Sequence, residues 1–260
     1  MPGRGVSSAA RPPEALRPEW AAPSNVRALF TLRSGGVSVG ACASLNVGEH
    51  VQDDPQAVAE NRRRIVAAFG LPAEPVWLKQ VHGAEVLRLG PQPPAAVAAD
   101  AVVTTEAERV CVIQVADCLP VLFASRDGAV VGAAHAGWRG LAAGVLERTV
   151  AALGVAPQGL VAWIGPGISA AHFEVGAEVR QALGSGAGAA AFVPNIRRRW
   201  QCDLVALTRQ RLAGLGVGEV SGGHWCTFAD AGRFFSHRRD GRCGRMAALI
   251  WRTRSPTNRA

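Results

Sequence analysis

The 260-residue chain contains a single lysine, Lys79, and none of its six cysteines forms a C-x-x-C pair. The missing C-x-x-C motif excludes the compact zinc-finger pattern, and the scattered cysteines do not form a disulfide framework. The cysteines stand at positions 42, 111, 118, 202, 226 and 243. We therefore expect reduced thiols and a cytoplasmic location.

Long apolar runs are also missing. The best one, residues 110–124, is broken by Asp117 and Pro120, and no run approaches the ~18 apolar residues of a membrane span. The first 20 residues are rich in Arg, Pro and Ala but lack the apolar region of a signal peptide. The sequence thus predicts no export signal and no membrane partner.

The charge is basic, with 28 Lys and Arg against 20 Asp and Glu. Nearly all of the cations are arginines, and several fall near the two ends of the chain, including Arg4, Arg11, Arg17, Arg252, Arg254 and Arg259. Net charge alone specifies little about a partner. We expect solvated arginines and no nucleic-acid partner, while a small phosphate-bearing substrate remains compatible.

Residues 1–25 are predicted to be a disordered basic tail, 26–251 a single catalytic domain and 252–260 a second disordered tail. Helices are expected at 55–70, 141–154, 203–216 and near 174–184, and neither G-x-G-x-x-G nor a Walker motif marks a nucleotide site. Strands are expected at 26–33, 76–82, 85–89, 100–105, 109–116, 119–124, 129–135, 160–165 and 245–251. Many strands follow one another directly, which favours an α+β domain with stacked sheets.

Three separate segments carry side chains that bind first-row metals. His82 lies in LKQVHG, Cys118 in ADC and His135 in AAHAGWRG, at spacings of 36 and 17 residues. Two imidazoles and one thiolate leave a fourth tetrahedral position free, as in catalytic sites. The sequence therefore predicts a zinc or copper ion bound by all three residues, with either metal compatible.

A metal-free interpretation fits two of these residues. His135 could deprotonate Cys118, which would attack a carbonyl as in cysteine hydrolases, but that mechanism does not require His82. Asp117 interrupts an apolar run beside Cys118 and needs a partner if it is buried. We predict Asp117, with His82, Cys118 and His135, to be catalytic, with Asp117 transferring protons.

Other polar positions are predicted to bind substrate: Arg33, Asn46, Arg62, Lys79, Gln80 and Arg139. Arginine forks bind phosphate or carboxylate, and a surface ion pair is the alternative. His237, Arg238 and Arg239 are expected in a basic loop anchored by two phenylalanines. His50, His172 and His224 are expected to be structural.

An ordered set of motifs extends over residues 26–251 and resembles the YfiH-type laccase-domain family, also called the multicopper polyphenol oxidase family. The motifs are WLKQVHG, DAVVTT, VADCLPVLFA, VGAAHAGWRGLAAGVLERTV, WIGPGIS, FEVG, CTF, FFSHRRDG and GRMAALIW. The resemblance implies a monomeric, cytoplasmic four-layer sandwich of mixed β-sheets flanked by helices, similar to the cysteine-hydrolase-like domain of cytotoxic necrotizing factor toxins. The family's metal ligands fall on His82, Cys118 and His135.

The resemblance also implies an activity. Family members cleave adenosine, inosine and methylthioadenosine with phosphate to free base and pentose 1-phosphate, and deaminate adenosine. Two alternatives stay open: a cysteine amidase that edits peptidoglycan precursors, and a copper-dependent phenol oxidase. Six histidines are too few for a four-copper laccase, which needs about ten at typical sites of four ligands per metal.

Overall fold

The computed structural model describes residues 11–92 and 97–254. Its first sheet has four antiparallel strands in the order β1-β2-β13-β5. These strands are β1 (Ala15–Leu16), β2 (Val26–Thr31), β13 (Met246–Arg252) and β5 (Cys111–Val115). In this register Ala248 lies between Phe30 and Ile113, so the last strand occupies the middle of the sheet.

The second sheet has six strands in the order β12-β8-β6-β7-β4-β3. They are β12 (Glu219–Gly222), β8 (Leu160–Ile164), β6 (Leu119–Ser125), β7 (Val131–Ala136), β4 (Ala101–Thr104) and β3 (Val86–Arg88). The two outer pairs, β12 with β8 and β3 with β4, are parallel, and the inner pairs are antiparallel.

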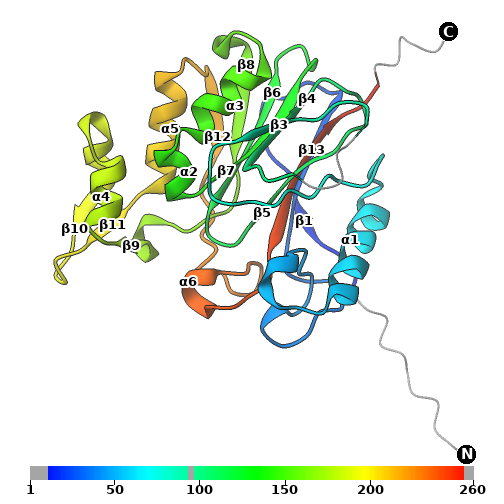
Figure 1. Cartoon of the computed structure of the whole chain (residues 1–260), viewed down its shortest axis with the longest axis horizontal. Helices are drawn as coiled ribbons and strands as arrows, with labels where there is room; N and C mark the ends of the chain where they lie inside the picture. Colours follow the sequence, from blue (N-terminus) through cyan, green and yellow to red (C-terminus); the bar gives the residue numbers. More distant parts are fainter. Residues whose placement is uncertain (1–10, 93–96, 255–260) are drawn as a thin grey trace, which may run out of the picture.

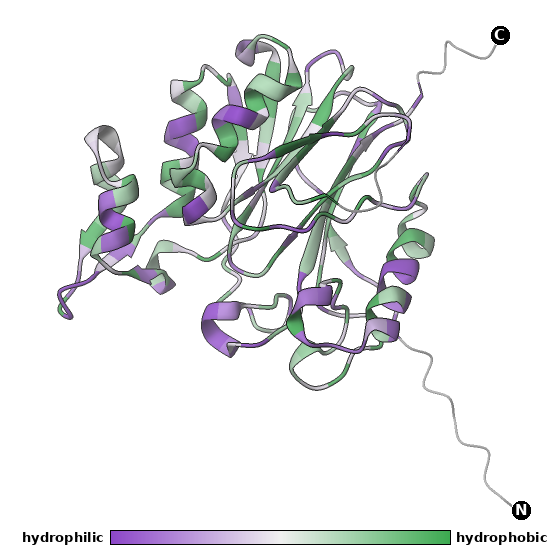
Figure 2. Cartoon of the chain, in the orientation of Figure 1, coloured by the Kyte–Doolittle hydropathy of each residue, from purple (hydrophilic) through white to green (hydrophobic). Residues whose placement is uncertain are grey.

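The two sheets pack against each other through a fully apolar layer. Phe30 and Ile113 from the first sheet and Leu122 from the second belong to one buried cluster. Figure 2 shows the hydrophobic colour concentrated on the strands and the hydrophilic colour on helices at the rim. Burial of both sheet faces explains why β5, β6, β7 and β13 are almost continuously apolar rather than alternating.

Helices cover the outer faces of both sheets (Figure 1). On the first sheet, Ile65 of α1 (Pro55–Phe69) packs with Leu249 of β13. On the second, α2 (Trp138–Ala142), α3 (Val145–Leu153) and α5 (Leu204–Gly214) cover the strands. The predicted α+β class with stacked sheets is confirmed.

A small third sheet, β10-β11-β9, lies at one edge of the molecule beside α4 (Figure 1). Its strands are β10 (Phe192–Pro194), β11 (Trp200–Cys202) and β9 (Glu174–Val175), and α4 is Ala177–Leu183. The remaining short helices are α6 (His237–Asp240) and the 3-10 turns Gly40–Cys42, Glu49–Val51, Pro157–Gly159, Ala170–His172 and Gly186–Ala191.

Two predicted helices begin where their capping residues indicate. The Asp54 carboxylate accepts the backbone N–H of Gln56 at the start of α1, and Asp203 accepts that of Ala206 at the start of α5. Helix α1 ends at Gly70, whose φ of 59° is left-handed. Side-chain caps and a terminal glycine are strong local signals, which explains these successes.

Other predicted boundaries are wrong. The helix predicted at 141–154 is divided into α2 and α3 because Gly144 has a φ of 83°, which ends one helix before the next begins. The strand predicted at 76–82 is a loop with one isolated bridge, from Lys79 to Ala98. Strands β9 to β12 were not predicted, because short strands carry weak periodicity.

The predicted tails also differ from the structure where it describes them. Ala15 and Leu16 pair with β2, so part of 1–25 belongs to the first sheet. Arg252 is the last residue of β13 rather than the start of a tail. Residues 1–10 and 255–260 lie outside the described residues. Within the described ranges, no helix has both the length and the apolarity to cross a membrane.

Candidate metal centre and its cavity

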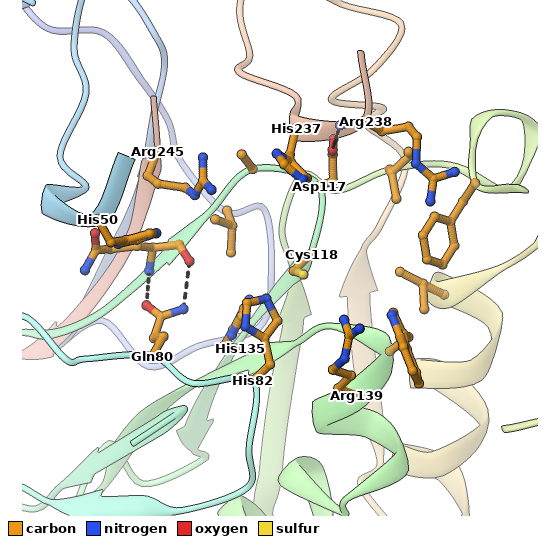
Figure 3. A pocket seen from close by; sticks show the side chains of 17 residues that line it. His50, Gln80, His82, Asp117, Cys118, His135, Arg139, His237, Arg238 and Arg245 are labelled. Carbon is orange, nitrogen blue, oxygen red and sulfur yellow. Dashed lines mark hydrogen bonds between the residues drawn. The ribbon is translucent and has the colours of Figure 1, made fainter. Parts of the chain in front are cut away.

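His82, Cys118 and His135 lie together although they come from separate segments (Figure 3). One ligand atom of each lies within 4.8 Å of the others. The two imidazole rings are 4.8 Å apart between centroids and inclined at 66°, so they approach from different directions. The structure therefore brings the predicted trio together at one point.

The positions of Cys118 and His135 follow from the two sheets. The chain leaves β5 in the first sheet and begins β6 in the second, and Cys118 is the last residue of this crossing. His135 lies in β7, where it pairs with Pro120 of β6. Cys118 thus lies at the junction of the sheets, next to the strand that carries His135.

His82 is placed by a turn rather than by a strand. Its φ is 60°, in the left-handed region that non-glycine residues rarely adopt. The backbone N–H groups of Val81, His82 and Gly83 all donate to the Asp100 carboxylate, at 3.1, 2.9 and 2.7 Å. These three bonds hold the turn in this unusual conformation, and the imidazole faces the thiol as a result.

The same carboxylate orients the second imidazole. Asp100 Oδ1 lies 2.8 Å from Nδ1 of His135, and the Asp100 side chain is fully buried. A proton on Nδ1 directed at a carboxylate leaves Nε2 free as the ligand atom, an arrangement found behind many metal-binding histidines. Asp100 therefore positions both histidines of the trio.

The thiol has room only because its neighbour is a glycine. A Cβ at Gly137 would lie 2.6 Å from the Cys118 sulfur and 3.7 Å from the His82 ring. That glycine immediately precedes α2. The small residue keeps open the space around the ligand atoms, so the donor set and the space around it both fit a metal ion.

The trio is strongly coupled in its protonation. Burial raises the pKa of the Cys118 thiol, but the His135 and His82 imidazoles outweigh it and lower this pKa to about 6. For His135, burial lowers the pKa, whereas the Cys118 sulfur and Asp100 raise it to about 9. Thiolate and imidazolium therefore coexist near neutral pH without a metal, and the thiolate is the form that binds one.

The trio lines a cavity of about 420 Å³. One part of its wall is apolar and comes from Ile168, Phe173, Trp138 and Leu204. Polar side chains in the wall include Gln80, Gln114 and His50. Pockets with one apolar wall and a few convergent polar groups are typical of small-molecule sites.

Three arginines surround this cavity (Figure 3). Arg139 is the second residue of α2, Arg238 lies in α6 and Arg245 precedes β13. Burial and then the nearby Arg245 guanidinium lower the pKa of His50, which favours its neutral form. Asp117 is the only acidic residue among those that line the cavity, so the cavity attracts anions.

Asp117 lies in the wall, but both of its oxygens are occupied. Oδ1 accepts from the Thr227 hydroxyl at 2.6 Å and Oδ2 from the backbone N–H of Arg238 at 2.7 Å. Its φ is 93°, again left-handed. The carboxylate that sequence analysis predicted to transfer protons therefore ties the β5–β6 crossing to the segment that carries Arg238.

Of the six predicted substrate-binding residues, two line the cavity. Arg139 does so with its guanidinium 4.3 Å from the centre of the Trp138 ring. The Gln80 amide is bound on both sides by the Gln114 backbone, with its Nε2 donating at 2.9 Å and its Oε1 accepting at 2.7 Å (Figure 3). Gln80 thus joins the His82 loop to β5.

The other four lie away from the cavity. The Arg33 guanidinium donates to the carbonyls of Ala43 and Ala231, and that of Arg62 donates to the Val47 carbonyl. Lys79 is exposed. These three side chains are absent from the cavity wall.

The fourth residue, Asn46, lies outside the cavity and positions one of the residues that line it. It is fully buried, and its Oδ1 accepts the backbone N–H of Arg245 at 2.8 Å. Its amide group donates to the Asp53 carboxylate at 2.8 Å. Asn46 therefore holds the backbone of a cavity arginine.

Sequence analysis missed Asp100, His50, Arg238 and Arg245 as site residues. Asp100 is the first residue of the predicted strand DAVVTT. A carboxylate at the edge of a buried strand was a signal from which a site residue could have been predicted. His50 was expected to be structural and Arg238 to lie in a basic loop. No local pattern connects these positions, because only the tertiary fold brings 50, 238 and 245 to one cavity.

The comparisons with known proteins agree on one family. A family model described as multi-copper polyphenol oxidoreductase laccase matches residues 27–253. The chain is 48% identical over 236 residues to purine nucleoside phosphorylase YfiH of Escherichia coli K12, covering 90% of this chain and 97% of that protein. It is 50% identical over 239 residues to a purine nucleoside phosphorylase of Pseudomonas aeruginosa, at 91% and 97% coverage.

The solved structures agree with the sequence comparison. The crystal structure of a Neisseria meningitidis protein of the DUF152 family superimposes with a TM-score of 0.86 at 45% sequence identity. The match covers 92% of this chain and 99% of that one. Most of the described fold therefore has a close structural counterpart.

Proposed function

The chain belongs to the multi-copper polyphenol oxidoreductase laccase family, and from this premise we propose that it is a metal-dependent purine nucleoside phosphorylase. The reaction would convert adenosine, inosine or methylthioadenosine and phosphate into free base and pentose 1-phosphate. The observation that carries the proposal is the His82–Cys118–His135 trio in a cavity that also holds three arginines.

In this proposal His82, Cys118 and His135 hold one ion, zinc or copper, by two nitrogens and a sulfur. The ion would supply Lewis acidity to a substrate atom at its open position. Asp100 keeps the His135 ring in the tautomer that ligates through Nε2. His135 is buried, Cys118 half-buried and His82 exposed, so a substrate would reach the ion from the side of His82.

The chain's own residues would bind the two substrates. Phosphate would lie among Arg139, Arg238 and Arg245, since guanidinium forks suit its oxygens and stabilise negative charge in the transition state. The purine would pack on the apolar wall, where Phe173 and Trp138 offer aromatic faces. Phosphate is thus bound by residues other than Arg33 and Arg62, which sequence analysis favoured together with Arg139.

The decisive experiment combines metal analysis with a nucleoside assay. Purified protein is expected to contain about one metal ion per chain and to release free base from inosine or adenosine only when phosphate is present. Cys118→Ala should lose both metal and base release. Cys42→Ala, a matched change at a buried thiol outside the cavity, should keep both. Base release without phosphate, or full activity in Cys118→Ala, would refute the proposal.

A deaminase side activity is the finer part of the same proposal. Zinc deaminases pair the ion with a separate carboxylate that moves protons. Asp117 is the one carboxylate in the cavity wall, but Thr227 and Arg238 occupy its oxygens. Inosine formed from adenosine when phosphate is omitted would reveal deamination, and Asp117→Asn should abolish it if this carboxylate acts.

A second candidate is favoured by one observation. Cys118, His135 and Asp100 form a thiol–imidazole–carboxylate series, and the pKa of Cys118 falls to about 6, as in cysteine hydrolases. In that case the chain would be an amidase acting on peptidoglycan precursors. Full activity after chelation, together with tolerance of His82→Ala, would favour this amidase over the phosphorylase.

Copper-dependent phenol oxidation is the remaining alternative, and six histidines do not supply a four-copper site.

A four-layer, cysteine-hydrolase-like sandwich is the fold we propose, supported by α1 and α3 lying on the outer faces of two stacked sheets. A cytoplasmic location and a monomeric state stay predictions.

A further inference from the structure

A second cluster of reactive groups lies outside the proposed metal centre. Cys226, Ser169 and His172 are in mutual contact, and none of them lines the cavity that contains Cys118. The cluster forms because Gly167 and Cys226 are joined by a parallel β-bridge. All three side chains are half-buried, so small molecules reach them while the surroundings keep them ordered.

The Cys226 sulfur has an unusual number of hydrogen-bond donors. The hydroxyl of Ser169 donates to it at 3.0 Å and the backbone N–H of Ser169 at 3.4 Å. The backbone N–H groups of Ala229 and Phe228 also help to lower the pKa of this thiol. A neutral thiol is a weak acceptor, whereas a thiolate is a strong one, so this cradle stabilises the charged form.

A proton acceptor lies beside the same sulfur. Nδ1 of His172 is 3.5 Å from Cys226 Sγ and 3.2 Å from Ser169 Oγ. The His172 ring stacks on Phe228, with centroids 4.5 Å apart and planes inclined by 21°. The stack fixes the imidazole with one nitrogen directed at the thiol. Burial raises the pKa of Cys226, but the hydrogen bonds to its sulfur, above all from the Ser169 hydroxyl, outweigh burial and lower this pKa.

The other thiols lack this combination. Cys42, Cys111, Cys202 and Cys243 are buried, and burial raises the pKa of each. Cys118 belongs to the proposed metal centre. Cys226 is therefore the one accessible thiol outside that centre, and it has both a base and an anion cradle.

We propose that Cys226 is a redox-modification site that reacts with hydroperoxides, with His172 as proton acceptor and Ser169 as donor to the thiolate. The thiol proton passes to Nδ1 of His172, and the sulfur attacks one oxygen of the peroxide. An S–O bond forms as the O–O bond breaks. The departing hydroxide, or alkoxide from an organic hydroperoxide, takes the proton from His172 and leaves as water or alcohol. Sulfur loses two electrons, the peroxide gains them, and the product is a sulfenic acid.

The site adjoins the cavity wall through its neighbour in the sequence. Thr227 donates to Asp117, and the Thr227 carbonyl accepts from the Arg239 guanidinium at 2.8 Å. Both contacts anchor the segment that carries Arg238. An added oxygen on Cys226 therefore lies one residue from the contact that fixes the β5–β6 crossing.

The test uses the full chain as purified, hydrogen peroxide as oxidant and dimedone to trap sulfenic acid, with each cysteine followed by peptide mass spectrometry. Native Cys226 should react about three- to tenfold faster than the same residue in the unfolded chain, because only the folded cradle stabilises its thiolate. His172→Phe keeps the stacking ring but removes the base, and Ser169→Ala removes one donor. Each should slow the reaction severalfold.

His224→Phe is the matched control, since His224 is two residues from Cys226 but its ring packs against Trp225 instead. It should leave the rate unchanged. The proposal is overturned if native Cys226 reacts no faster than in the unfolded chain, a comparison that needs no variant. It is also overturned if His172→Phe and His224→Phe give equal rates. Loss of nucleoside cleavage would not affect either result, so the two proposals fail independently.

Discussion

The Asp100 carboxylate accepts from the His135 ring at 2.8 Å and, through the same oxygen, from the backbone N–H of His82 at 2.9 Å. One fully buried side chain thus orients one imidazole directly and the turn of the other through its backbone. The geometry of the trio depends on this residue more than on any other outside the trio.

Replacing Asp100 by Asn should weaken metal binding about 10- to 100-fold, as loss of a carboxylate behind a ligating histidine does elsewhere. An amide has a single accepting oxygen. Either the His135 ring and the His82 N–H, or the Val81 and Gly83 N–H groups, therefore lose their acceptor. Competition with a chromogenic chelator measures the affinity. Asp54→Asn is the control, because Asn also caps helices and no residue of α1 lines the cavity. Equal affinity of the two variants would contradict the assigned role.

Removal of the metal should expose the coupled titration of Cys118 and His135. Alkylation of Cys118 in chelator-treated protein should rise with a midpoint near pH 6. The lowered Cys118 pKa means that its thiolate contributes stability that is lost as pH falls through about 6. The raised His135 pKa means that its imidazolium contributes stability that is lost as pH rises through about 9. His135→Gln should move the alkylation midpoint upward, and a wild-type midpoint near that of a free thiol would disprove the coupling.

Neutralising a cavity arginine should weaken the binding of phosphate more than the binding of nucleoside. Arg238→Gln and Arg245→Gln are each expected to raise the KM for phosphate roughly tenfold, the effect of losing one charge-assisted hydrogen bond. The KM for inosine should change little. Arg148→Gln, which removes an exposed partner of Glu85, serves as control. A selective rise in the nucleoside KM would place the purine, rather than phosphate, beside these arginines.

Adding one methyl group at Gly137 should damage the metal centre without large effects elsewhere. Its Cβ would lie 2.6 Å from Cys118 Sγ, so the thiol must move away from the imidazoles. Metal content of Gly137→Ala should fall markedly. Gly214→Ala, at the exposed end of α5 where a Cβ meets nothing within 4 Å, should raise stability by about 0.5 kcal/mol. Undiminished metal content in Gly137→Ala would show that the thiol has room to shift.

The sequence was sufficient to find the trio because each ligand lies in a distinctive segment. His82 precedes a glycine, Cys118 follows an unexpected carboxylate in an apolar run, and His135 lies two residues before a glycine at the end of another apolar run. Helices with side-chain caps, such as α1 and α5, were equally accessible. Local chemistry decides these features, and local chemistry is visible in a sequence.

The cavity arginines were not accessible in the same way. Arg33 and Arg62 have the same side chain as Arg238 and Arg245, and all four guanidinium groups donate to backbone carbonyls. Only the tertiary fold decides which of them also line the cavity. Asn46 illustrates the same limit, since it acts through the backbone of residue 245. Long-range pairing decides these roles.

The central place of β13 has a consequence for synthesis on the ribosome. Residues 246–252 separate β2 from β5, so a nascent chain that lacks them leaves two apolar strands without their shared neighbour. The metal ligands have all emerged by residue 135, more than a hundred residues earlier. The growing polypeptide therefore contains all three metal ligands before the first sheet can be completed. Premature termination leaves the edges of β2 and β5 unpaired, and unpaired strand edges promote aggregation.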